Sequence, residues 1–262
     1  MLGWHLITRV NEDAQPVKIV QAAAGALGER MAGTHSHAEG FLPQHLGDVP
    51  DLRGHGRSSV PDRGYSPRDM AADLLALFDY LRLAQAVLIA HSSGAEVAAT
   101  AAVNWPGRVR ALIMLDPAYG IAAADRDQCE RLSADLAGPD AATVASRYVA
   151  RLDTGQTPAG LARLHRTRPL GYPAVVIRRS YDDFTFGPDA IRIRPRTETF
   201  LSGRVAPMLA IYRNATRAAV GRAFIGRPGD RVLTYPGAGH WLHQEQPARF
   251  AADVDNWLKE ER

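Results

Sequence analysis

The chain has 262 residues, of which 46% are hydrophobic and 23% are charged, with a formal net charge of +3. This length and balance fit one large α/β domain, with or without an inserted segment, and exclude a disordered or fibrous chain. The basic residues are nearly all arginines and form no block with interleaved aromatic residues, which argues against a nucleic-acid partner.

The single cysteine and the apolar segments indicate the setting in which the protein works. Cys129 cannot form a disulfide within the chain, which favours a reducing, cytoplasmic compartment. The start, MLGWHLITRV, lacks the basic and apolar regions of a signal peptide. No apolar run approaches the ~18 residues that cross a bilayer, so no membrane partner is expected. The expected partner is a small-molecule substrate, and the oligomeric state, monomer or homodimer, is left open.

The first part of the chain carries weak signals. Residues 2–10 and 17–20 are predicted to form short strands, whereas residues 21–48 are rich in Gly, Ala and His and have weak periodicity. Four histidines of the first part are candidates for a metal site, but their spacing fits no standard ligand set, and no metal or other cofactor is predicted. They are His35, His37, His45 and His55.

A helix signal begins at Ser66. The stretch SPRDMAADLLALFDYLRL offers Ser66 as the N-cap, Pro67 at the first helical position and Asp69 three residues after the cap. Apolar residues then recur at helical spacing, which predicts an amphipathic helix. These residues are Met70, Leu74, Leu77, Phe78 and Leu81.

A strand–helix–strand unit follows this helix. AVLIA at 86–90 is a short, partly branched apolar run, which is typical of a buried parallel strand. SGAEVAATAAVN at 93–104 is predicted to form a helix, and VRALIML at 109–115 a second buried strand. This order implies a right-handed crossover and a parallel sheet.

Residues 121–205 interrupt the strand–helix pattern. Helical stretches at 126–138 and 141–152 lie in Pro- and Arg-rich sequence, and no convincing buried strand appears until PMLAIY at 207–212. Such a segment is typical of an inserted helical lid. RVLTYPG at 231–237 predicts a last strand, and PARFAADVDNWLKEE closes the chain as an amphipathic helix.

The turn after the strand at 86–90 has the form small-x-Ser-x-small. A nucleophile on a sharp turn has strained backbone angles, and small residues such as Ala90 and Gly94, two positions before and after it, relieve the crowding. This register makes Ser92 the predicted nucleophile and excludes Ser93, because the large His91 stands two residues before Ser93. An ordinary strand-to-helix turn with chance serines would give the same pattern.

His240 and Asp116 stand where the partners of this serine are expected. His240 follows the last predicted strand, in YPGAGHWLHQEQPARF, and Asp116 follows the strand at 109–115, in IMLDPAYG. The carboxyl ends of parallel strands meet at one edge of a sheet, where ligand sites form. A serine nucleophile needs a base, and the base needs an orienting carboxylate. Asp116 as a turn residue before Pro117 is the alternative, and His243 is expected to pack or to cap a helix.

Three stretches of the chain resemble the α/β-hydrolase superfamily. They are PDLRGHGRSS, the nucleophile elbow AHSSG with the downstream NWPGRVRALIMLDPA, and GAGHWLHQEQPARF. The resemblance covers most of residues 50–120 and 205–260. It implies an α/β fold, with a mostly parallel sheet flanked by helices, a core of residues 1–120 and 206–262, and an inserted helical lid of residues 121–205.

In this superfamily, the order Ser92, Asp116, His240 implies the catalytic triad of a serine hydrolase. Most members place the acid after the strand that precedes the histidine strand, usually as Gly-x-x-Asp, but here Arg213 and Thr216 stand at those positions. Some members, including one subgroup of haloalkane dehalogenases, take the acid from the strand after the nucleophile helix. That position is the position of Asp116.

A second departure concerns the oxyanion hole. The strand near residue 20 ends in His-Gly in the superfamily, whereas this chain has QAAAG at 21–25. The Ser93 amide is expected to be one donor, since a helix N-terminus stabilises developing negative charge. The amide of Ala22 or Ala23 is expected to be the second, because a backbone donor needs no particular side chain.

The resemblance implies hydrolysis of a carboxylic ester or lactone through an acyl-enzyme, without a cofactor. Serine at position 92 argues against dehalogenase or epoxide-hydrolase chemistry, which use a carboxylate nucleophile. Three alternatives stay open: carbon–carbon bond hydrolysis of a diketone, a peracid-forming activity of the haloperoxidase type, and a catalytically weak ligand-binding protein. An aromatic pocket with Arg178 or Arg179 near an acidic substrate group is a further hypothesis, against the simpler interpretation of a solvated lid surface.

Overall fold

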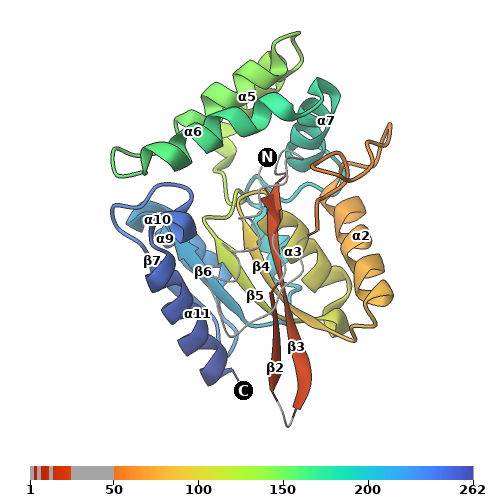
Figure 1. Ribbon diagram of the computed structural model, residues 1–262, viewed down its shortest axis with the longest axis vertical. Helices are drawn as coiled ribbons and strands as arrows, with labels where there is room; N and C mark the ends of the chain where they lie inside the picture. The colour runs from red at the N-terminus through yellow and green to blue at the C-terminus, as the bar shows by residue number, and fades with distance from the viewer. Residues whose placement is uncertain (1–2, 5–6, 12–13, 25–49, 262) are drawn as a thin grey trace.

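A seven-stranded sheet forms the centre of the structure, a computed structural model that describes residues 3–4, 7–11, 14–24 and 50–261 (Figure 1). The strand order is β1-β3-β4-β5-β6-β7, and β2 pairs with β3. The strands from β3 to β7 are parallel, whereas β1 and β2 pair with β3 in the antiparallel sense. The strands are β1 Gly3–Trp4, β2 Ile7–Asn11, β3 Ala14–Ala24, β4 Ala86–His91, β5 Val109–Leu115, β6 Met208–Tyr212 and β7 Arg231–Thr234.

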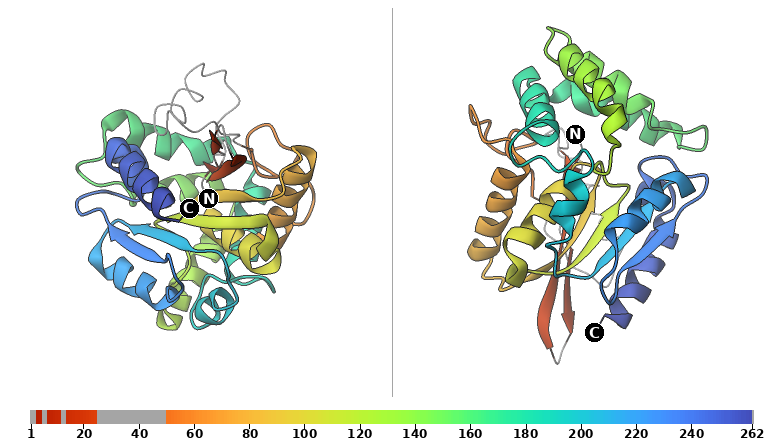
Figure 2. Two further views of the ribbon diagram at one scale, coloured as in Figure 1. Left: turned by 90° about the horizontal axis from the view of Figure 1, so that it is seen from below. Right: turned by 180° about the vertical axis from the view of Figure 1, so that it is seen from behind.

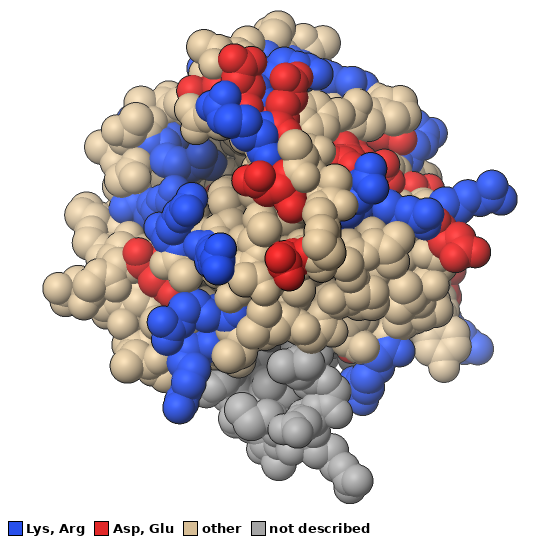
Figure 3. Space-filling model, turned by 90° about the horizontal axis from the view of Figure 1, so that it is seen from above, with Lys and Arg blue, Asp and Glu red and all other residues tan. Residues whose placement is uncertain are grey.

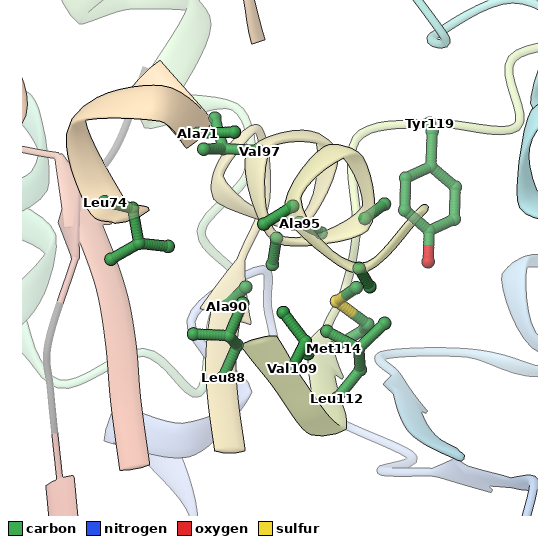
Figure 4. Packing of buried hydrophobic residues seen from close by; sticks show 14 of the residues in the cluster. Ala71, Leu74, Leu88, Ala90, Ala95, Val97, Val109, Leu112, Met114 and Tyr119 are labelled. Atoms are coloured by element: carbon green, nitrogen blue, oxygen red, sulfur yellow. The ribbon is translucent and has the colours of Figure 1, made fainter. Parts of the chain in front are cut away.

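The side chains of the central strands alternate between two apolar layers. On one face, Leu88, Leu112 and Met208 belong to a cluster with helices α2 (Pro67–Tyr80) and α3 (Gly94–Asn104), and Figure 4 shows this packing. On the other face, alternate strand residues pack against α11 (Pro247–Glu260). Figure 2 shows the helices on both sides of the sheet. Burial on both faces explains why these strands are continuous apolar runs.

The local signals in the sequence match the elements that the chain forms. Ser66 caps α2, since its hydroxyl accepts a hydrogen bond from the Asp69 amide and the Asp69 carboxylate accepts one from the Ser66 amide. The predicted strands at 86–90, 109–115, 207–212 and 231–237 are confirmed as β4, β5, β6 and β7, with bounds that differ by at most three residues. The predicted mostly parallel α/β fold is also confirmed.

The chain between β5 and β6 is helical. Its helices α5, α6 and α7 lie across one edge of the sheet (Figures 1 and 2). A short parallel bridge between Ile121 and Ile193 joins the beginning of this segment to its later part. The α-helices are α4 Arg126–Leu136, α5 Ala141–Ala150, α6 Ala159–Thr167, α7 Ala174–Thr185 and α8 Arg196–Leu201. After β6 come α9 Ala215–Gly221 and α10 Leu242–Glu245.

Some sequence predictions concern residues that the structure does not describe. His35, His37 and His45 lie outside the described residues, as does most of the stretch 21–48. Within the described ranges, no group of three or more His, Cys, Asp or Glu side chains could hold a metal ion. No helix in this part of the chain is both long and apolar enough to cross a membrane.

Candidate active site

Ser92 stands on the sharp turn between β4 and α3. Its φ is 55°, in the left-handed region that non-glycine residues rarely adopt. The turn is held at several points: the Ser92 amide donates to the Leu115 carbonyl at 3.0 Å, and its carbonyl accepts from Ala95 and Ala118 at 3.0 and 3.1 Å. A strained serine at the end of a parallel strand is the geometry of a nucleophile elbow.

Asp116 follows β5, the strand next to β4. Its amide donates to the carbonyl of Ile211 at 2.7 Å, and its side chain is only 1% exposed. Oδ2 of Asp116 lies 2.6 Å from Nδ1 of His240. Asp116 therefore orients a histidine from a distant part of the chain, a role that a simple turn residue before Pro117 would not have.

His240 lies in the loop between β7 and α10. A carboxylate only accepts hydrogen bonds, so Nδ1 of His240 is the donor to Asp116, and in the neutral ring Nε2 is left as the basic nitrogen. Nε2 is buried and has no hydrogen-bond partner among the described residues. His240 and Ser92 line the same cavity without a hydrogen bond between them, and such bonds often form only with the substrate in place.

The cavity has a volume of about 350 Å³. The ends of β4 and β5 and the loop after β7 contribute Ser92, Asp116 and His240 to its wall. The helical segment contributes the opposite, largely apolar and aromatic wall. Residues of that wall include Leu132, Tyr148, Val149, Tyr172, Ile177 and Tyr181. A volume of this size fits a small organic molecule.

The electrostatics of the Asp116–His240 pair favour a neutral imidazole beside a charged carboxylate. Burial by itself raises the pKa of Asp116, but the hydrogen bond from His240 and the charges of Arg217 and Arg213 outweigh burial and hold this pKa below its ordinary value. Burial lowers the pKa of His240, Asp116 opposes that shift, and the two arginines add to it. With its pKa below the ordinary value, His240 is neutral at neutral pH and can accept a proton.

Two arginines flank the carboxylate of Asp116. Arg213 follows β6, and its Nη1 lies 3.2 Å from Oδ2 of Asp116. Arg217, in the first turn of α9, places Nε 3.4 Å from Oδ1 and also donates to the Pro117 carbonyl. The sequence analysis noted Arg213 only as a departure from Gly-x-x-Asp. The spacing of four residues between the two arginines was the available signal that both reach one site.

A buried ion pair lies behind the nucleophile turn. Nη2 of Arg192 lies 2.6 Å from Oε2 of Glu96 in α3, and it also donates to the Ser93 hydroxyl at 2.9 Å. Burial opposes the charge on Arg192, but the neighbouring Glu96 holds the pKa of the guanidinium above its ordinary value. The Ser93 hydroxyl is therefore engaged by a cation, which agrees with the choice of Ser92 over Ser93.

Residues before α6 hold the histidine loop in place. The His240 amide donates to the Leu152 carbonyl at 3.1 Å. The Thr157 hydroxyl donates to Oε1 of Glu245 at 2.7 Å, and Oε2 of the same carboxylate accepts from the Gly239 amide at 2.6 Å. We refer to this set, Leu152, Thr157, Gly239 and Glu245, as the loop clasp. The sequence analysis did not find it.

His165 of α6 adds a second connection to the same loop. Its Nδ1 lies 2.7 Å from Asp153, and its Nε2 lies 3.0 Å from Oε1 of Gln244. The imidazole also stacks on Trp241, with ring centroids 3.7 Å apart and planes 15° apart. The helical segment and the histidine loop are thus joined by several side chains.

The neighbouring histidines support the loop from inside. Nε2 of His91 lies 2.8 Å from the His240 carbonyl, and burial together with the nearby His240 and His243 holds the pKa of His91 well below its ordinary value. His243 is buried in α10, with its ring 5.0 Å from that of His91. The prediction that His243 packs against its surroundings is confirmed.

The predicted oxyanion donors lie near Ser92 in the sheet and in α3. Ser93 precedes α3 and lines the cavity. Ala22 pairs with Ala90, two residues before the nucleophile, and β3 continues past Ala23 to Ala24. The assignment of these amides as donors stays a prediction.

Arg178 and Arg179, considered above as contacts of an acidic substrate, lie elsewhere. Both are exposed residues of α7, and Nε of Arg178 lies 3.6 Å from Oδ2 of Asp182. Neither belongs to the described residues that line the cavity. The arginines of the cavity wall are Arg192, Arg213 and Arg217.

Comparisons with known proteins agree with this geometry. A model of the Alpha/beta hydrolase family matches residues 29–253. The 2-(acetamidomethylene)succinate hydrolase of Mesorhizobium japonicum is 26% identical over 228 residues, which are 79% of this chain and 76% of that protein. The 2-hydroxymuconate semialdehyde hydrolase of a Pseudomonas species is 26% identical over 239 residues, 81% of this chain and 76% of the relative.

The fold matches solved structures over nearly the whole chain. The enol-lactonase from Burkholderia xenovorans superposes with a TM-score of 0.74, at 17% identity, over 98% of this chain and 96% of that one. At that identity the similarity concerns the fold alone.

Proposed function

Because the chain belongs to the α/β hydrolase family, we propose that it is a serine hydrolase that cleaves a carboxylic ester or lactone through an acyl-enzyme. The observation that carries the proposal is the 2.6 Å contact of His240 with Asp116 in a cavity that Ser92 also lines. Three residues far apart in the sequence meet at one edge of the sheet, in the order and chemistry that nucleophilic catalysis needs.

In the proposed mechanism, Ser92 Oγ attacks the substrate carbonyl while Nε2 of His240 accepts the hydroxyl proton. Asp116 holds the imidazole in the required tautomer and stabilises its protonated form. The amides of Ser93 and of Ala22 or Ala23 bind the tetrahedral oxyanion. The imidazolium then gives its proton to the leaving alcohol as the C–O bond breaks. Water, deprotonated by His240, attacks the acyl-enzyme and releases the acid and Ser92.

We also infer that residues 121–205 act as a lid that determines which substrate fits. The apolar and aromatic wall of the cavity comes from this segment, while the reacting groups come from the strand ends. The substrate is a small molecule, and the mechanism needs no cofactor. The cytoplasmic location stays a prediction that rests on the single cysteine, Cys129.

The proposal is tested by labelling with a fluorophosphonate probe and by hydrolysis of p-nitrophenyl butyrate. We expect wild-type protein to be labelled and active, and Ser92→Ala to lose both properties. Ser93→Ala is expected to keep the labelling, since its backbone amide is retained. Labelling that persists in Ser92→Ala would contradict the assigned nucleophile, and a wild-type protein that neither reacts nor hydrolyses esters or lactones would favour a ligand-binding protein.

A carbon–carbon bond hydrolase with the same triad is the alternative within the enzyme class. A screen over aryl esters, lactones and diketones separates the two. Turnover of diketones at a kcat/KM above that of the best ester or lactone would replace the proposed reaction while keeping the three residues.

A further inference from the structure

The charges around Asp116 do not balance. Both guanidinium groups, from Arg213 and Arg217, lie within 3.4 Å of this one carboxylate, which also accepts the hydrogen bond from His240. Among the described residues, no second carboxylate lies within ion-pair distance of either guanidinium. With His240 neutral, two positive charges face one negative charge.

This excess of positive charge lies at the cavity. Both arginines line it together with Ser92, and their side chains are 25% and 28% exposed, so neither is fully buried. Each guanidinium carries five N–H donors, more than Asp116 can accept. The third cavity arginine, Arg192, is paired with the buried Glu96 and has no such excess.

The other charges nearby do not cancel the excess at this wall. Asp125 also lines the cavity, but it is exposed and belongs to the short turn before α4, where it accepts from Gln128. On the face seen from above, Lys and Arg side chains gather toward the left, and acidic side chains lie mostly from the centre to the right (Figure 3). Among the described residues, the unbalanced charge of Arg213 and Arg217 lies at the cavity wall next to Ser92 and His240.

We propose that Arg213 and Arg217 bind a carboxylate of the substrate, so that the cavity selects acidic esters or lactones over neutral ones. Planar guanidinium groups match a carboxylate with paired, charge-assisted hydrogen bonds, and a partly desolvated site strengthens them. The inference rests on the proposed function for the reaction, but the carboxylate site itself does not depend on turnover.

A purely structural role of the two arginines makes a different prediction. If the two arginines only hold Asp116 in place, their removal lowers the affinity or the rate of hydrolysis by the same factor for every ligand, whatever its charge. If they bind a carboxylate, their removal weakens the binding of anionic ligands and leaves the affinity for neutral isosteres unchanged. The ratio between an anionic and a neutral ligand is therefore the decisive quantity.

The binding test uses Ser92→Ala protein, titrated calorimetrically with glutarate and with the neutral dimethyl glutarate. We expect glutarate to bind at least tenfold more tightly, with an affinity that falls as NaCl is added. Adding Arg213→Met should weaken the binding of glutarate by about tenfold and leave the affinity for the diester unchanged. The matched control Arg178→Met removes an exposed arginine outside the cavity wall and should change neither affinity. Equal affinity for both ligands, or an unchanged Kd in Arg213→Met, overturns the proposal.

Arg217→Met serves as the second variant, and thermal unfolding identifies any variant that does not fold. Hydrolysis of p-nitrophenyl hemiglutarate against p-nitrophenyl butyrate separates this inference from the proposed function. If Ser92 is labelled but the anionic ester is hydrolysed no faster than the neutral one, the carboxylate site is contradicted and the proposed function is not. The opposite outcome is also possible to detect: glutarate binds in a way that depends on Arg213, but Ser92 never reacts. This result contradicts the proposed hydrolase reaction and supports the carboxylate site.

Discussion

The two walls of the cavity are built in different ways. On the strand side, Ser92 and Asp116 each follow a buried parallel strand, and both have positive φ angles fixed by backbone hydrogen bonds. On the helical side, α4, α5 and α7 bring together side chains such as Tyr148 and Tyr181 through contacts between helices, including the hydrogen bond that the Tyr181 hydroxyl donates to the Cys129 carbonyl. The backbone of the sheet determines the positions of Ser92 and Asp116, whereas contacts between distant helices determine the shape of the space that these residues face.

The difference shows which changes each wall tolerates. A strand-side residue has a fixed place and a specific chemical task, so its replacement affects the reaction more than the fold. A residue that joins the two walls affects stability or the position of His240 instead. The following predictions test this distinction.

Asp116→Asn should have the largest effect on turnover. The amide keeps the shape of the side chain but favours the wrong tautomer of His240, and we expect kcat/KM for p-nitrophenyl butyrate to fall on the order of 10³–10⁴-fold. Asp125→Asn, at the exposed rim of the same cavity, is the matched control and should retain the activity. An Asp116→Asn enzyme with most of its activity would show that the orienting carboxylate is misassigned.

Arg192→Met should mainly affect stability. It leaves Glu96, which is fully buried, without a partner, and we expect the free energy of unfolding to drop by about 3–5 kcal/mol. Urea denaturation measures the change. The double variant with Glu96→Gln should regain part of the loss, because the unpaired buried charge is then removed. If the single variant is as stable as wild type, Glu96 has no charge to compensate in the folded protein.

Thr157→Val should remove one hydrogen bond of the loop clasp with little change in side-chain size, together with the bond that the Thr157 hydroxyl accepts from the Thr154 amide. The Glu245 carboxylate loses one of its two hydrogen bonds, so His240 is held less firmly, and kcat should fall about tenfold while KM changes little. The exposed Thr199→Val in α8 provides the control for the same chemical change. A change confined to KM would indicate that the clasp shapes the cavity instead of placing the base.

The smallest effect concerns pH. The pKa of His240 is below its ordinary value, and activity needs the neutral imidazole, so kcat/KM should rise as pH increases through that pKa and level off above it. Arg213→Met removes a positive charge that opposes protonation, so the pKa rises and the acid limb moves to higher pH. Among the described residues, the titratable or charged groups that face His240 are Asp116, Arg213, Arg217 and His91.

A pH profile of kcat/KM with the small neutral ester measures this shift. Arg178→Met should leave the acid limb in place, since Arg178 does not contact the site. A limb that moves to lower pH in Arg213→Met would contradict the assigned direction.

Local sequence signals predicted the strand side of the site well. The capping box at Ser66, the apolar run before Ser92 and the strand before Asp116 each depend on neighbouring residues, so the elements could be predicted from short windows. β3 was predicted only at 17–20 but covers Ala14–Ala24, because its small and polar end residues carry no apolar signal. The fold class followed from the order of these elements.

Two helices of the helical side, predicted at 126–138 and 141–152, are confirmed as α4 and α5, but the contacts between distant segments could not be predicted in the same way. Glu96 and Arg192 are separated by 96 positions, and no pattern in either neighbourhood indicates the other. The same holds for Thr157 with Glu245. Such contacts depend on how helices pack in three dimensions, and a single sequence gives no measure of that packing.

The loop clasp has a consequence for how a ligand enters. The carbonyl of Leu152 holds the backbone of His240, and Leu152 also lines the cavity. If that segment swings outward to admit a ligand, the same hydrogen bond pulls on the loop that carries His240. In the proposed mechanism, proton transfer then follows closure, because the imidazole regains its position only after the segment has returned over the ligand.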